Sequence, residues 1–275
     1  MTKPNSKGKR LDLLLEELGL CTSRQVARTA IMEGVVLVNG NKITKAGTLI
    51  KDGAKIEFTS DWKIQKYVSR GGQKLEKALQ EFGLDVKGRT CLDLGASTGG
   101  FTDCLLQFGA AYVYAIDVGY GQLAWSLRSD ERVKVIERTN ARNIQRQLLY
   151  PGQAQVADLA VMDVSFISVS KVLPAVIQCL DPPGQIITLV KPQFEAGREH
   201  ISKGGVVRSK EVHKQVLERV IADARALDLQ PQSLTYSPLR GPQGNLEFLL
   251  LLSKQENDFD MSIVGAVAEQ AQLVD

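Results

Sequence analysis

Long apolar runs are absent from this 275-residue sequence. Even the strongly apolar run from Phe248 to Leu252 is far shorter than the roughly 20 apolar residues of a membrane-spanning helix, and it suits a buried strand. The N-terminal stretch MTKPNSKGKR is polar and no apolar segment follows it, so we do not expect a secretory signal peptide. These features predict a cytoplasmic protein that does not associate with membranes.

Cysteine and histidine are also scarce. The chain has 4 Cys and 2 His, no two cysteines form a C-x-x-C pair, and His200 and His213 lie far from all of them in the sequence. Zinc sites and disulfide frameworks need such residues at close, regular spacing. We therefore expect no metal site and no disulfides, and we expect the cysteines to be buried thiols.

The net charge of +3 is small but unevenly distributed. Residues 1–67 contain 12 Lys and Arg against 7 Asp and Glu, whereas the rest of the chain contains 22 against 24. A basic segment joined to a nearly neutral one suits a polyanion that the first part holds and the second part modifies. Charge alone would equally describe a solvated basic surface.

The first 58 residues have the pattern of a small α+β domain. Residues 10–20 carry apolar side chains at helical spacing, and Ser23 is placed to cap a second helix over 24–34. Asn39-Gly40 predicts a hairpin turn between short strands, and further short β segments follow up to residue 58. Residues 59–69 have no clear period and are interpreted as a linker.

From residue 70 to residue 255 the pattern is that of a larger α/β domain. Five strand-like apolar runs, each followed by a polar turn and a helical segment, predict a doubly wound, mostly parallel, Rossmann-like sheet. Two final β runs with no helix between them predict an antiparallel last strand. Residues 256–275 form an amphipathic tail to which the sequence assigns no definite structure.

Basic side chains are clustered in the predicted small domain. Residues four apart are neighbours on a helix, so Arg24 and Arg28 share one face. The candidate RNA contacts are Lys9, Arg10, Arg24, Arg28, Lys42 and Lys45. The block SRQVARTAIMEGVVLVNG resembles the S4 RNA-binding domain over about residues 8–58, and this resemblance implies recognition of folded RNA through its shape and backbone. The alternative is a small adaptor domain with solvated Lys and Arg.

A glycine-rich loop follows the first strand of the large domain, in LDLGASTGGF (residues 92–101). Glycine lets a backbone approach a ligand closely. Asp117 ends the next strand, where a carboxylate can accept hydrogen bonds from ribose hydroxyls, and Asn140 could hold an adenine edge. The predicted cofactor residues are Asp93, Gly95, Ala96, Ser97, Gly99, Gly100, Phe101, Asp117 and Asn140.

The loop favours S-adenosylmethionine over a dinucleotide. Its spacing is G-x-x-x-G-G and not the G-x-G-x-x-G of dinucleotide sites. The acidic Asp93 before the first glycine would repel a pyrophosphate, but it would suit a cationic aminoacyl group. A purely structural glycine turn is the alternative.

Four charged residues stand at positions that an open α/β sheet brings together. Asp163 and Lys191 end the fourth and fifth strands, and ligands bind outside the carboxyl ends of parallel strands. Glu247 starts the antiparallel last strand and so lies at the same edge. Lys74 precedes the first strand, in SRGGQKL. Each charge alone would be an ordinary surface residue, but two strand-end charges beside apolar runs indicate a site.

Lys74, Asp163, Lys191 and Glu247 resemble the catalytic Lys-Asp-Lys-Glu set of FtsJ-type ribose 2′-O-methyltransferases. With the small domain, nearly all of residues 8–252 resemble the TlyA (haemolysin A) family, through blocks such as YVSRGGQKLEKAL, AIDVGYGQL, DLAVMDVSFIS and GREHISKGGVVR. One departure is Ser209-Lys210, where an Asp-Pro-like pair is expected. The resemblance implies an S-adenosylmethionine-dependent methyltransferase that acts on ribosomal RNA.

Three other functions compete with this prediction. A non-catalytic RNA-binding or assembly factor could retain the same fold. A base methyltransferase would usually carry an Asn/Asp-Pro-Pro-aromatic motif where this chain has Asp163-Val164-Ser165-Phe166. A pore-former, which the haemolysin label suggests, would need a span or a long alternating β stretch that the sequence lacks. The Gly-rich segment 195–208 could be a lid over RNA or an ordinary surface loop.

Overall fold

The structure is a computed structural model of the whole chain, and it describes residues 8–21, 24–59, 66–152 and 155–274. Two compact units divide at Val68 and Ser69. The predicted cap Ser23 and most of the predicted linker lie outside the described residues.

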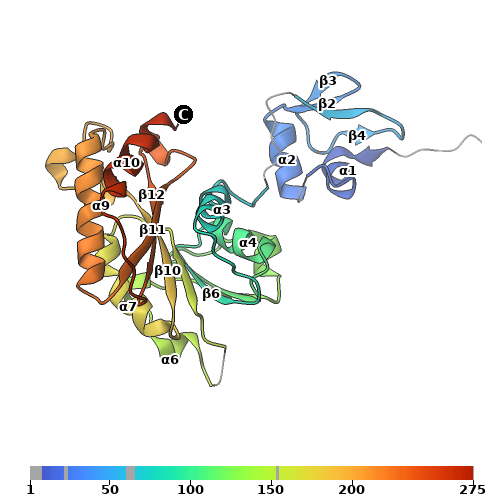
Figure 1. Cartoon of the computed structure of the whole chain (residues 1–275). Coiled ribbons are helices and arrows are strands. Elements are labelled where there is room, and N and C mark those ends of the chain that lie inside the picture. The colour runs from blue at the N-terminus through green and yellow to red at the C-terminus, as the bar shows by residue number, and fades with distance from the viewer. Residues whose placement is uncertain (1–7, 22–23, 60–65, 153–154, 275) are drawn as a thin grey trace, which may run out of the picture. The chain divides into compact units, whose positions relative to one another are not determined.

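The N-terminal unit contains two helices and short β pairs (Figure 1). Its helices are α1 (Leu11–Glu17) and α2 (Arg24–Met32), and its strands are β1 (Lys9–Arg10), β2 (Val36–Val38), β3 (Asn41–Ile43), β4 (Leu49–Ile50) and β5 (Ile56–Phe58). The predicted hairpin is confirmed, because Val38 pairs with Asn41 across the Asn39-Gly40 turn and both turn residues have positive φ. Leu11, Leu15 and Ile31 form the centre of a small core.

The C-terminal unit is built on one seven-stranded sheet, in the order β11-β12-β10-β9-β6-β7-β8. Its strands are β6 (Thr90–Leu94), β7 (Tyr112–Ile116), β8 (Val133–Ile136), β9 (Leu159–Met162), β10 (Gln185–Val190), β11 (Gln230–Tyr236) and β12 (Phe248–Ser253). In the described part of this sheet, β12 is antiparallel to β10 and β11, and all other neighbouring strands pair in parallel. The predicted sheet and its antiparallel last strand are therefore confirmed.

Helices cover both faces of this sheet (Figure 1). On one side lie α3 (Gly71–Glu81) and α4 (Gly100–Gln107), and on the other lie α7 (Leu173–Cys179), α9 (Lys210–Arg225) and α10 (Ile263–Gln270). Short helices α5 (Trp125–Arg128), α6 (Arg146–Leu149) and α8 (Pro192–Glu195) complete the connections. Burial on both faces explains the nearly continuous apolar strands, such as the fully buried β9.

Residues 256–274 contain a helix, α10, that the sequence alone did not predict. Helix α10 packs on α9 and β11, and its Val264 and Ala268 are buried in the main core. Ser209, where the chain departs from the family pattern, caps α9, because its hydroxyl accepts a hydrogen bond from the backbone N–H of Val212. Serine is among the favoured residues at this position.

The Gly-rich segment 195–208 is attached to the core at its end. Val207 is buried, its N–H donates to Asn245 Oδ1 at 3.0 Å, and its carbonyl contacts His213 Nε2 at 3.0 Å. The Asn245 amide also donates to the carbonyl of Gly205 at 2.9 Å. A lid that moved as one piece would have to break these bonds, so this half of the segment is better described as an anchored loop.

The four cysteines are buried and unbridged, as predicted. Burial raises the pKa of Cys21 and Cys179 to about 11 and that of Cys91 to about 12. A protonated, buried thiol is a poor nucleophile and a poor metal ligand. Among the described residues, no helix is both long enough and apolar enough to span a membrane.

Candidate active site

A cleft at the carboxyl edge of the sheet brings together the four charged residues that the sequence singled out. Lys74, Asp163, Lys191 and Glu247 all line one cavity of about 380 Å³. They come from α3, the end of β9, the end of β10 and the residue before β12. Because β12 runs antiparallel, its start lies at the edge where the parallel strands end.

The four charges form two ion pairs. Lys74 Nζ lies 2.5 Å from Glu247 Oε2, and Lys191 Nζ lies 2.5 Å from Asp163 Oδ1. Both lysines are 8% exposed and Glu247 is 1% exposed. Buried charges persist only when they are paired or hydrogen-bonded, so each lysine is held in place by its carboxylate.

Ser165 is a further member of this cluster, and the sequence analysis did not identify it. Lys191 Nζ donates a hydrogen bond to Ser165 Oγ at 2.7 Å. An ammonium group has three N–H donors. Lys191 uses one of them on Ser165, and Asp163 faces the ammonium group as its ion partner. Since Lys191 lines the cleft, an oxygen bound there can accept a further N–H of its ammonium group.

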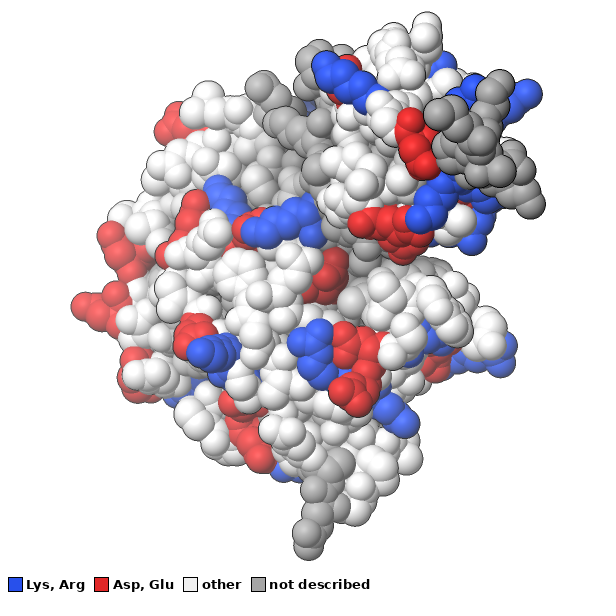
Figure 2. Space-filling model, turned by 90° about the vertical axis from the view of Figure 1, so that its right-hand side faces the viewer, with Lys and Arg blue, Asp and Glu red and all other residues white. Residues whose placement is uncertain are grey.

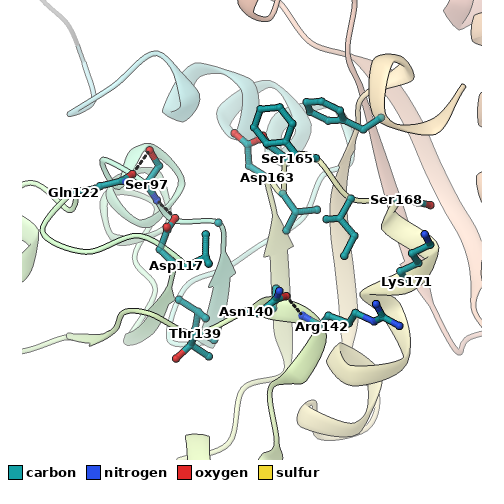
Figure 3. Close-up of a pocket in the computed structure, with 18 residues that line it drawn as sticks. Ser97, Asp117, Gln122, Thr139, Asn140, Arg142, Asp163, Ser165, Ser168 and Lys171 are labelled. Atoms are coloured by element: carbon teal, nitrogen blue, oxygen red, sulfur yellow. Dashed lines mark hydrogen bonds between the residues drawn. The ribbon is translucent and has the colours of Figure 1, made fainter. Parts of the chain in front are cut away.

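A second, larger cavity adjoins the first. It measures about 670 Å³ and shares Gly95, Ser97, Asp163 and Ser165 with the cleft of the four charges. Figure 3 shows its labelled side chains at the ends of neighbouring strands, with Asp117 and Gln122 on one side and Lys171 on the opposite side. A volume in this range suits a nucleoside-sized ligand.

Asp117 is held rigidly at the rim of the larger cavity. One of its oxygens accepts the N–H of Ser97 at 2.8 Å, and the other accepts the N–H of Gly119 at 2.6 Å. A carboxylate has about four lone-pair sites, so both oxygens can still accept hydroxyl protons. This arrangement fits the predicted contact with a ribose.

Asn140 also lines the larger cavity, but its carbonyl oxygen is already engaged. Asn140 Oδ1 accepts the N–H of Arg142 at 3.0 Å and so caps a short 3₁₀ turn (Figure 3). Its amide N–H groups are the remaining donors. They could bind a ring nitrogen of adenine, which is a narrower role than the sequence alone suggested.

The predicted cofactor residues divide between the two cavities. Gly95, Ser97, Asp117 and Asn140 line the larger one. Of the two cavities, the cleft of the four charges is the one lined by Ala96, Gly100 and Phe101. Asp93 and Gly99 line neither of the two.

Asp93 lies beneath the glycine loop and does not face a ligand. Its side chain is fully buried, and Oδ2 accepts the hydroxyl proton of Thr102 at 2.6 Å. Burial raises its pKa to about 7. The prediction that Asp93 contacts an aminoacyl group is therefore not supported, because the strand turns its side chain into the core. Asp117 and Asp163 supply the carboxylates of the cavities instead.

Two of the predicted glycines, Gly99 and Gly100, leave room for close packing within the protein. A Cβ on Gly99 would lie 2.3 Å from a methyl group of Leu127. A Cβ on Gly100 would lie 2.8 Å from the backbone nitrogen of Gly72, where α3 and α4 meet. The close contact at Gly100 brings α3, and with it Lys74, to the cleft.

Gly95 is the position of this loop where the backbone most clearly requires glycine. Its φ is +84°, and a Cβ there would lie 2.6 Å from the backbone oxygen of Asp163. Only glycine tolerates both the left-handed conformation and this approach. The loop after β6 can therefore lie against the end of β9, where the two cavities meet.

Other lining residues were missed because no local motif marks them. Gln122 lies beside Ser97, with 3.4 Å between Ser97 Oγ and Gln122 Oε1. Phe166, with 91% of its surface exposed and a positive φ, packs on Phe194 with ring centroids 4.9 Å apart. A strained, exposed aromatic beside a cavity is unusual, but the sequence DVSFIS gives no sign of it.

The residues that line the larger cavity fit the groups of S-adenosylmethionine. The carboxylates of the cavity, Asp117 and Asp163, are suited to hydroxyl and ammonium groups, and Val118 and Ile167 offer apolar surface to an adenine ring. Arg142 and Lys171 are the cations on its wall. The chemistry of these side chains fits a nucleoside with a cationic tail.

The six candidate RNA contacts of the N-terminal unit are all exposed. Several have acidic partners: Lys9 pairs with Glu17, and Arg10 and Arg24 both pair with Asp12. On the face in Figure 2, Lys and Arg side chains alternate with Asp and Glu side chains and do not form one large basic patch.

Comparison with known proteins gives two family matches. Residues 67–254 match the FtsJ-like methyltransferase model, and residues 9–56 match the S4 domain model.

Individual relatives align over nearly the whole chain. The chain is 49% identical over 247 residues to "Putative rRNA methyltransferase YqxC" of Bacillus subtilis, covering 90% of this chain and 86% of the relative. It is 45% identical over 246 residues to "16S/23S rRNA (cytidine-2'-O)-methyltransferase TlyA" of Mycobacterium tuberculosis, covering 90% of each. A solved structure, "Putative hemolysin from Streptococcus thermophilus", has 42% identity and a TM-score of 0.73, covering 97% of this chain and 96% of that one.

Proposed function

The chain belongs to the TlyA family of FtsJ-like methyltransferases with an S4 domain, and on this premise we propose that it methylates a ribose 2′-hydroxyl of ribosomal RNA. S-adenosylmethionine is the proposed methyl donor. The observation that carries the proposal is the meeting of Lys74, Asp163, Lys191 and Glu247 in a cleft that opens onto the larger cavity. Ribosomal RNA as the substrate places the enzyme in the cytoplasm.

Positioning is the first contribution of the site. The four residues shared by the two cavities lie where the methyl donor and the acceptor oxygen must meet. S-adenosylmethionine supplies a methyl group on a positively charged sulfur, which makes that carbon open to attack. Holding two reactants in the attacking geometry can account for much of the rate. Gly95 permits this arrangement because it lets the loop approach Asp163.

Lys191 acts on the acceptor hydroxyl. A ribose hydroxyl has a pKa far above 7, so attack is easier when negative charge on the oxygen is stabilised. The ion pair with Asp163 and the hydrogen bond to Ser165 hold the ammonium group of Lys191 at the cleft. In its paired, protonated form Lys191 donates to the developing alkoxide. With the methyl donor bound, the oxygen would form its bond to the methyl carbon as the carbon–sulfur bond breaks, and the hydroxyl proton would pass to water.

Lys74 and Glu247 form the second ion pair that lines the cleft. Glu247 is held close to Gly241, since a Cβ on that glycine would lie 2.2 Å from Glu247 Oε1. The carboxylate has little room to move and keeps Lys74 at the cleft. We assign Lys74 to the orientation of the ribose or of its neighbouring phosphate.

The exposed Phe166 packs on the half-buried Phe194 beside these charges, and Lys191 Nζ is 5.8 Å from the centroid of the Phe194 ring. Such a surface suits a nucleotide base taken out of its stack. The N-terminal unit supplies a separate contact with RNA through its exposed Lys and Arg.

The test is transfer of tritiated methyl groups to ribosomal RNA from a strain that lacks this gene. Nuclease mapping locates the modified nucleotide, and resistance of the adjacent linkage to alkaline cleavage identifies a 2′-O-methyl group. A control RNA fragment with a 2′-deoxynucleotide at the mapped position should accept no label. Label on that fragment would indicate base methylation and refute the proposal.

Two alternatives have distinct outcomes. Tight binding of S-adenosylmethionine with no methyl transfer to any ribosomal RNA would favour an RNA-binding assembly factor. Leakage from liposomes caused by the pure protein would favour the membrane activity that the name of some relatives suggests.

A further inference from the structure

The sequence identified Arg10 and Arg24 as separate basic residues, but in the structure they meet on one carboxylate. Asp12, in the first turn of α1, is fully buried. Arg10 binds it with two hydrogen bonds, from Nε to Oδ1 and from Nη2 to Oδ2, both at 2.9 Å. Arg24 Nε donates to the same Oδ2 at 3.0 Å.

This shared oxygen fixes the distance between the two guanidinium groups. Arg10 Nη2 and Arg24 Nε each lie about 3 Å from Oδ2, so these nitrogens lie within about 6 Å of each other. Two cations at this distance repel each other. Without a carboxylate between them, the two flexible side chains would separate.

Most donors of the pair still face outward. A guanidinium group has five N–H donors. Arg10 uses two of its five on Asp12 and Arg24 uses one. The side chains are 44% and 48% exposed, while that of Asp12 is 0% exposed. The cluster therefore presents two adjacent cationic groups, with the anion beneath them and out of reach of a ligand.

The backbone around Asp12 also restricts Arg10. The N–H of Asp12 donates to the carbonyl of Ala46 at 3.1 Å, which attaches α1 to the following loop. A Cβ on Gly47 would lie 3.3 Å from Arg10 Nη1, so the guanidinium group lies against the bare backbone there. Arg10 is thus held from two sides.

We propose that Asp12 is a positioning residue for RNA binding, which holds Arg10 and Arg24 as a two-guanidinium clamp for the RNA phosphate backbone. Arginine forks match phosphate oxygens in geometry, and a preformed pair loses less side-chain freedom on binding. This inference rests on the proposed function, in that the N-terminal unit contacts RNA.

The sign of the Asp12→Asn effect separates this role from simple charge attraction. If only charge mattered, removal of a carboxylate would strengthen RNA binding. The clamp predicts the opposite, because the two arginines would separate. We expect the affinity of Asp12→Asn for deproteinised ribosomal RNA to fall by about three- to tenfold in filter binding at about 0.1 M KCl.

The matched control is Glu57→Gln. Glu57 is an acidic residue of β5 in the same unit, paired with Lys55 at 2.8 Å, with its side chain 43% exposed. Glu57→Gln changes the net charge by the same amount as Asp12→Asn, but Glu57 touches neither arginine of the clamp. Its RNA affinity should be unchanged or slightly higher. Asp12→Asn binding as tightly as Glu57→Gln, or more tightly, would overturn the proposal.

A double-mutant cycle excludes a purely structural role. In the Arg10→Ala, Arg24→Ala background, Asp12→Asn should cause no further loss of RNA affinity, because it has nothing left to position. The slope of log affinity against log salt should also decrease in Asp12→Asn, as fewer phosphates are neutralised. An equal loss in both backgrounds would contradict the clamp.

Thermal unfolding shows whether Asp12→Asn is folded. If it is not, a second comparison tests the clamp. Arg24→Lys keeps the charge but loses the fork on Asp12, whereas Arg28→Lys makes the same change one turn further along α2, away from Asp12. The clamp predicts a larger loss of RNA affinity for Arg24→Lys. Equal losses would reject it.

The unmodified chain distinguishes failure of the clamp from failure of the proposed function. If the parent protein neither binds nor methylates ribosomal RNA, the proposed function fails. If the parent does both and Asp12→Asn binds equally well, only the clamp fails.

Discussion

Replacement of Lys191 by alanine tests the catalytic assignment most directly. The change removes an ammonium donor from the cleft and leaves Asp163 without its cation. Loss of a single donor to a developing oxyanion typically costs a factor of about 100–1,000 in turnover. A hundredfold loss corresponds to about 2.7 kcal/mol of transition-state stabilisation.

The structure predicts that this loss falls on turnover and not on cofactor binding. Lys191 lines the cleft of the four charges but not the larger cavity, and the Asp163 side chain, 23% exposed, can be solvated when its partner is lost. We therefore expect Lys191→Ala to lower single-turnover methyl transfer at least about a hundredfold. Its affinity for S-adenosylmethionine, measured by calorimetry, should stay within about threefold of that of the parent, a difference of less than 1 kcal/mol.

The matched control is Lys134→Ala, which removes an exposed lysine of β8. It changes the net charge equally and should retain the parent turnover. Unchanged turnover in Lys191→Ala would refute the assignment. A parallel loss of cofactor affinity would instead show that Lys191 acts in binding.

Three further substitutions test the roles of Lys74, Asp93 and Ser165. Lys74→Ala leaves the buried carboxylate of Glu247 without its partner, and this should cost about 3–5 kcal/mol of stability. Adding Glu247→Gln should restore much of the melting temperature but not the activity. A double mutant as unstable as the single one would contradict the pairing. Burial raises the pKa of Asp93 to about 7, so the folded state favours the protonated carboxyl. This contribution to stability is complete below about pH 4 and is lost as the pH rises towards 7. Asp93→Asn should therefore gain melting temperature relative to the parent between about pH 5 and pH 8, and a constant difference across this range would show that the pKa is not raised. Ser165→Ala removes one of the two groups that orient Lys191 and should reduce turnover by about tenfold with unchanged cofactor affinity, whereas full turnover would show that Asp163 alone suffices.

Much of the site's composition could be predicted from the chain alone, for identifiable physical reasons. Asp117, Asp163 and Lys191 directly follow apolar runs, and the ends of parallel strands meet at one edge of a sheet. Glu247 was placed at the same edge by the lack of a helix before the last strand, which requires an antiparallel return. Alternation of strands and helices was likewise sufficient to predict the layers of the fold.

The sequence by itself determined which elements form and which charges reach the cleft edge, because hydrophobic period and strand ends are local properties. Only the tertiary structure decided how those charges pair and what the glycines are for. It turned Asp93 into the core, placed Ser165 on Lys191, and joined Arg10 to Arg24 through Asp12. Each of these depends on the direction of a side chain between segments distant in the chain, and no local pattern encodes that direction.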